Sequence, residues 1–318
     1  TYNTSLSYVD QQGILPGHSH KRYTGNFQMN YKLSDKVRFN TSLMIGQRNT
    51  QEPPFANDAF VLMVFGMQGL QMPYLPDGSG RYAARAYARI WQNRNPLLVA
   101  NEWWTKYTQY NIRPMATLKV DLLKGLTWET TGAASYDPTY TKMNVYPVTA
   151  YYYQPVNGEY IYANDQWPNG RGVTQENYRT NHYTFFSTLN YGKTFGESSI
   201  NVFAGYSMEY NYYEELGAYR QKYPVFTLPQ IDVGTLEVST NHGTASEWAL
   251  MSYFGRFNYQ FKDKYLAEIN FRYDGSSRID PEYRWGLFPS FSAGWRISNE
   301  DFAKGAHWLD NLKLRASY

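Results

Sequence analysis

The chain has 318 residues with 30 basic and 27 acidic side chains, a balance too even for a surface that tracks nucleic-acid phosphates. It has no cysteine, which excludes disulfide frameworks, thiolate metal sites and cysteine nucleophiles. Its 32 Tyr, 17 Phe and 9 Trp favour β-structure, because aromatic side chains are enriched in strands.

Apolar and polar side chains alternate in the first strongly patterned segments. A period of two is typical of strands whose two faces have different surroundings. In residues 21–33, polar side chains such as Gln28 alternate with an apolar set. That set includes Tyr23, Phe27 and Tyr31. Residues 37–45 repeat the pattern through Phe39 after only three intervening residues, which predicts a tight hairpin.

Three more hairpins of the same design follow along the chain. They pair 112–122 with 126–136, 183–191 with 200–208, and 253–261 with 265–273. An opening strand at 2–8 and a closing pair at 291–297 and 312–316 bring the total to about eleven. The side chains expected to face lipid are Tyr23, Phe27, Tyr31, Phe39, Leu118, Val202, Phe257 and Ile269.

The connections alternate between turns of a few residues and long segments, at about 49–104, 137–182 and 211–249. In an up-and-down antiparallel sheet this places the tight turns on one rim and the long loops on the other, as in outer-membrane barrels. The mean hydropathy of −0.62 is compatible with such a wall, because only alternate residues face lipid. We therefore predict an all-β fold, a transmembrane antiparallel up-and-down β-barrel.

About eleven strands are half of the roughly 22 in a plug-bearing transporter barrel. The alternation runs into both ends of the chain. We therefore expect residues 1–318 to be part of one barrel domain, with the remaining strands and a plug domain outside this sequence.

Catalytic signatures are absent from the sequence. HExxH, GxSxG, Walker A and GxGxxG motifs do not occur, so neither an enzyme nor a nucleotide cofactor is predicted. Of the five histidines only His18 and His20 are close together, and two ligands do not make a metal site. We expect no metal and no cofactor.

Aromatic residues in the long connections are the candidates for substrate binding. Flat rings stack on sugar faces or on apolar peptide side chains, although aromatics near strand ends also form girdles at lipid headgroups. The candidates are Trp91, Trp103, Trp104, Tyr152 and Trp167. In the first long connection, the apolar run Phe60–Met67 predicts a short helix.

The C-terminal third contains the most specific motifs, YLAEINFRYDGSSRIDPEYRWGLFPSFSAGWRISNEDF at 265–302 and LDNLKLRASY at 309–318. They resemble the SusC/RagA-like TonB-linked outer-membrane proteins, with Ile279 where that pattern usually has Phe. The opening YVDQQGILPG and the NPLL element at 95–98 agree more loosely. The resemblance implies an N-terminal plug that contacts the TonB complex and a SusD-like surface lipoprotein over the barrel.

Two functions remain open from the sequence. The first is TonB-dependent import of a glycan or oligopeptide across the bacterial outer membrane, with lipid around the wall and no nucleic-acid partner. The second is a soluble or surface-exposed β-rich carbohydrate-binding module that uses the same aromatic residues. The need for detergent after extraction separates them.

Overall fold

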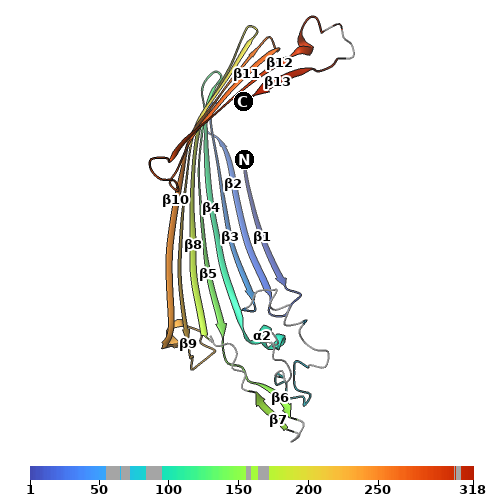
Figure 1. Ribbon diagram of the computed structural model, residues 1–318, viewed down its shortest axis with the longest axis vertical. Helices are drawn as coiled ribbons and strands as arrows, with labels where there is room; N and C mark the ends of the chain where they lie inside the picture. The colour runs from blue at the N-terminus through green and yellow to red at the C-terminus, as the bar shows by residue number, and fades with distance from the viewer. Residues whose placement is uncertain are drawn as a thin grey trace.

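One antiparallel sheet of 11 strands dominates the computed structural model (Figure 1). The structure describes residues 1–54, 65, 72–83, 95–154, 159–163, 172–303, 305 and 309–318. The strands of this sheet are β1 (Tyr2–Gln12), β2 (Ser19–Lys32), β3 (Val37–Glu52), β4 (Trp104–Leu123), β5 (Leu126–Val145), β8 (Gly172–Phe195), β9 (Ser198–Gln221), β10 (Thr235–Phe261), β11 (Tyr265–Ser276), β12 (Trp285–Arg296) and β13 (Lys313–Ser317).

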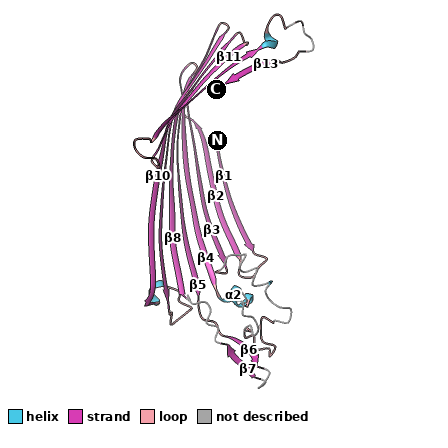
Figure 2. Ribbon diagram, in the orientation of Figure 1, coloured by secondary structure: helices cyan, strands magenta, loops and turns pink. Residues whose placement is uncertain are grey.

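Each of these strands pairs with the next one along the chain, so the sheet has up-and-down order. A separate hairpin of β6 (Ala150–Gln154) and β7 (Glu159–Ala163) is inserted between β5 and β8. The short helix α2 (Pro96–Glu102) precedes β4, and two 3-10 turns, η1 (Ile231–Val233) and η2 (Ile297–Asn299), lie in later connections. Figure 2 shows a single twisted layer of strands, with α2, β6 and β7 gathered at one end.

The sequence prediction of the strands is confirmed in number and pairing. All four predicted hairpins form, as β2 with β3, β4 with β5, β8 with β9, and β10 with β11. Among the described strands β1 and β13 are edges, and neither pairs with the other. The sheet is therefore open.

The strands are longer than the alternation predicted, and this corrects the bounds of the long connections. These connections run only from 53 to 103, 146 to 171 and 222 to 234. Beyond Tyr183 and Tyr210 the apolar face carries charge, because Arg179 and Glu214 form an ion pair of 2.6 Å there. Where both faces of a strand meet water, apolar and polar side chains need not alternate. The alternation in the sequence therefore ends before the strands do.

The tight turns lie on one rim of the sheet, and the connections 53–103, 146–171 and 222–234 lie on the other (Figure 1). The turns at 33–36, 124–125, 196–197 and 262–264 form the short-turn rim. Three segments depart from this rule. The long connection 297–312 lies on the short-turn rim, and the shorter connections 13–18 and 277–284 lie on the opposite rim. At Gly125, with φ of +84°, a Cβ atom would lie 2.2 Å from the carbonyl oxygen of Gly192, so no side chain fits.

No helix among the described residues is long and apolar enough to cross a membrane. The helix predicted at Phe60–Met67 lies outside the described residues except for Phe65.

Candidate functional site

The apolar face of the sheet is continuous across the strands. Tyr31 lies opposite Phe39, and Phe39 lies opposite Leu118. From Leu118 the register passes through the small hydroxyl residues Thr130 on β5 and Ser187 on β8 to Tyr206 on β9, four residues from Val202. Val202 lies opposite Phe257, which lies opposite Ile269. Tyr23 and Phe27 share the face of Tyr31 at spacings of four, so all eight side chains predicted to face lipid share this face.

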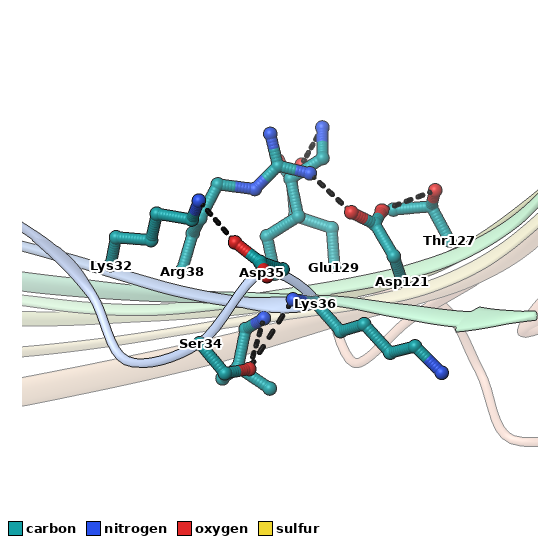
Figure 3. Close-up of polar contacts among 10 residues, drawn as sticks. Lys32, Ser34, Asp35, Lys36, Arg38, Asp121, Thr127 and Glu129 are labelled. Carbon is teal, nitrogen blue, oxygen red and sulfur yellow. Dashed lines mark hydrogen bonds and ion pairs between the residues drawn. The ribbon is translucent and has the colours of Figure 1, made fainter.

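The polar face carries charges that pair across neighbouring strands (Figure 3). Arg38 Nη2 lies 2.6 Å from Asp121 Oδ2, and Thr127 Oγ1 donates to Asp121 Oδ1 at 3.0 Å. Lys119 Nζ lies 3.1 Å from Glu129 Oε2 in the next row. Exposed pairs of this kind contribute little stability each. These pairs make the polar face hydrophilic, and its charged side chains form ion pairs and hydrogen bonds with one another.

An aromatic group interrupts the polar face and was missed by the sequence analysis. The ring centroid of Phe254 lies 5.5 Å from that of Phe186 and 5.7 Å from that of Phe203. The guanidinium carbon of Arg272 lies 5.6 Å from the Phe254 ring centroid. The available signal was the adjacent pair Phe185 and Phe186, since consecutive strand residues must point to opposite faces.

The long-connection rim contains a small core around α2. The Asn95 side chain caps the helix by accepting bonds from Leu97 N and Leu98 N, and its Nδ2 donates to the carbonyl oxygens of Pro73 and Ala83. The core cluster is Leu98, Val99, Ala100, Trp103, Val145 and Ala150. This packing joins the first long connection to the end of β5 and the start of β6.

Glu102 accepts two phenol hydrogen bonds beside this core. Tyr82 Oη donates to Oε1 at 2.9 Å, and Tyr146 Oη donates to Oε2 at 2.6 Å. Burial, opposed in part by Asn101 and reinforced by Glu102, raises the pKa of Tyr82 to about 12. Burial and Glu102 likewise raise the pKa of Tyr146. Both phenols therefore stay protonated at neutral pH and hold the connection together as donors.

Of the aromatic candidates for substrate binding, the structure describes the side chains of Trp103 and Trp104, and these two have different surroundings. Trp103 is 2% exposed, and its Nε1 donates to the Tyr146 carbonyl oxygen at 2.7 Å, so this ring packs in the rim core. Trp104 begins β4 on the apolar face, with Lys106 Nζ 4.3 Å from its ring centroid. Tyr152 lies in β6 opposite Ile161, and its side chain is outside the described part of the chain. Trp91 and Trp167 also lie outside the described residues.

No family model matches the chain. Among curated proteins, it is 29% identical to TonB-dependent receptor P39 of Formosa agariphila, over 99% of this chain and 28% of that protein. It is 26% identical to TonB-dependent receptor SusC of Bacteroides thetaiotaomicron, over 100% of this chain and 32% of that protein. The chain thus spans about a third of the length of these relatives.

The resemblance to SusC-like TonB-dependent receptors is confirmed. Solved structures agree on the fold. The RagAB peptide transporter matches with a TM-score of 0.74 at 20% identity, over 99% of this chain and 34% of that one. The ferripyoverdine receptor of the Pseudomonas aeruginosa outer membrane matches with a TM-score of 0.54 at 11% identity, over 94% and 36%. The SusC-like relatives are named as receptors and not as enzymes.

Proposed function

We propose that this chain forms about half of the wall of a TonB-dependent outer-membrane importer for a glycan or an oligopeptide. The apolar face meets lipid, the polar face lines the interior, and the short-turn rim faces the periplasm. The complete importer also contains a plug, which contacts the TonB complex, and a SusD-like lipoprotein at the cell surface.

The observation that carries the proposal is the separation of the two faces across β2, β3 and β4. An apolar row runs from Tyr31 to Leu118 on one side of β2, β3 and β4, and the ion pair of Arg38 with Asp121 lies on the other side. A wall between hydrocarbon and water requires this separation. Because each unpaired backbone group costs several kcal/mol in lipid, the edges β1 and β13 need further strands to complete a barrel.

The soluble carbohydrate-binding module is less well supported. A β-sandwich covers its apolar face with a second sheet. Among the described residues, the only other sheet is the two-stranded β6–β7 hairpin, which is too small to cover the face that carries Phe257 and Ile269.

Adjacent single-cysteine variants of the full-length receptor test the assignment of the faces. This segment has no cysteine, so in a receptor without cysteines elsewhere Phe257→Cys and Asn258→Cys each place a single thiol on one face. In native outer membranes we expect a water-soluble maleimide to label residue 258 and not residue 257, and a lipid-soluble maleimide to label residue 257. Equal labelling of both residues by the water-soluble reagent contradicts a lipid-facing wall.

Uptake tests the transport part of the proposal. Cells that carry the receptor should take up fluorescently labelled oligosaccharides or oligopeptides that support their growth. Deletion of TonB should abolish that uptake. A tagged receptor should also retain a surface lipoprotein through purification. Alanine variants of Trp91, Tyr152 and Trp167 then test the loop aromatics, whose loss should weaken substrate capture.

A further inference from the structure

Two arginines lie directly opposite each other on the polar face. Arg22 of β2 is paired in register with Arg48 of β3. Tyr23 points to the apolar face, so its neighbour Arg22 points to the polar face. The pair is ten residues from the end of β2 at Lys32 and therefore lies toward the long-connection rim.

Neither guanidinium has an acidic partner among the described residues. The contrast is Arg38, which shares β3 and the polar face with Arg48 and pairs with Asp121 at 2.6 Å. Asp137 is already engaged, since it accepts from Asn111 at 2.5 Å and from Arg113 at 3.5 Å. Like charges directly opposite each other on a sheet are destabilising. Since neither arginine has an acidic partner here, a bound anion would stabilise the pair.

A hollow of about 400 Å³ lies at this pair. Its lining includes Ser7, Arg22, Thr24, Gly46, Arg48 and Asn111. Gly46 places no side chain into the space between its neighbours, and the hydroxyls of Ser7 and Thr24 add neutral donors beside the two cations. Apart from Met44, the side chains that line the hollow carry hydrogen-bond donors or positive charge, and no carboxylate is among its described lining residues.

We propose that Arg22 and Arg48 bind an oxyanion group, a carboxylate or a sulfate, on the oligomer that passes along this wall. The inference rests on the proposed import function and adds the charge of the substrate to it. A guanidinium group can donate two parallel hydrogen bonds to two oxygens of a carboxylate or a sulfate, and one anion between two arginines also removes their mutual repulsion. The substrate class is therefore acidic: a uronic-acid or sulfated glycan, or an acidic peptide.

Binding to the full-length receptor in detergent tests the site. The probes are tetragalacturonate, a sulfated galactotetraose and an aspartate-containing hexapeptide, each compared with its neutral counterpart by titration calorimetry. We expect the receptor to prefer at least one anionic probe, and the Arg22→Gln/Arg48→Gln variant to lose roughly ten- to a hundredfold in affinity for it. The three anionic probes distinguish carboxylate from sulfate and glycan from peptide.

Two matched variants control for general effects on charge and folding. Arg38→Gln removes one positive charge from the same face of β3 and should leave the preference for the anionic probe unchanged. Arg22→Lys/Arg48→Lys keeps both charges without the bidentate geometry and should retain part of the preference. A receptor that binds no anionic probe better than its neutral counterpart, or a double Gln variant that keeps the preference, overturns the proposal.

Thermal unfolding of the ligand-free receptor separates a substrate group from an acidic side chain elsewhere in the protein. At low ionic strength, Arg22→Gln should raise the melting temperature, because it relieves the repulsion from Arg48. A lowered melting temperature shows that another part of the receptor already neutralises the pair, and overturns the proposal. Uptake that persists without TonB contradicts the import function instead, because binding to the purified receptor does not depend on TonB.

Discussion

An arginine at position 27 should be far more costly than an arginine at position 28. Phe27 lies midway between Tyr23 and Tyr31 on the apolar face of β2. Those tyrosines are eight residues apart, which is about 26 Å along a strand and about 20 Å along the membrane normal at a tilt of about 40°. Phe27 is therefore about 10 Å from either tyrosine level and close to the bilayer midplane.

The expected cost follows from that depth. Phe27→Arg should lower the free energy of unfolding by roughly 2–4 kcal/mol, the range for a cation at the midplane of a barrel. Gln28 faces the polar side between Asn3 and Ser42, so Gln28→Arg should cost much less.

Denaturant titration of the full-length receptor in lipid vesicles measures both variants. The comparison is internal, because the two positions share one strand and one depth and differ only in face. Equal losses of stability, or a larger loss for Gln28→Arg, would refute the assignment of the faces.

Three further perturbations test other parts of the structure. Gly205→Ala should cost about 1–3 kcal/mol, because the new Cβ would lie 2.3 Å from the Phe254 ring, whereas Gly132→Ala, with nothing within 4 Å, should change the unfolding midpoint little. Asn95→Ala should cost about 1 kcal/mol of local stability by removing the cap of α2, seen as faster amide exchange in 97–102 and no change in β9. Bonds from Lys264, Trp295 and Tyr265 lower the pKa of Glu300 from 4.5 to about 2, so its stabilising contribution is complete above pH 4.5 and is lost as the pH falls toward 2. Trp295 fluorescence in the folded receptor should therefore hold until the pH approaches 2, and a transition centred near pH 4.5 would contradict these bonds.

The strand pattern was predictable because the membrane-spanning part of each strand separates two solvents. Phe257 and Asn258 show this separation in adjacent residues. The outer ends of the strands were not predictable by the same rule, since Arg179 and Glu214 pair on the apolar face beyond the tyrosines. The sequence analysis therefore assigned those residues to loops.

The aromatic candidates show a different limit of sequence reasoning. Trp103 and Trp104 are neighbours, yet one is buried in the rim core and the other begins a strand beside Lys106. Aromatic character alone cannot separate a packing ring from a binding ring. The cap at Asn95 followed by proline was the usable signal, because it predicts a helix whose end fixes Trp103.

The long outer ends of β8, β9 and β10 have a consequence for how a solute first meets this protein. Backbone pairing of β8 with β9 continues from Tyr183 and Tyr210 to Gly172 and Gln221. The sheet is therefore regular between these tyrosines and the long-connection rim. A visiting molecule there meets side chains already held at fixed spacings, and little backbone freedom is lost when it docks. Under the proposed import function, point substitutions on these strand ends should change which solutes are captured without altering the membrane-spanning part of the wall.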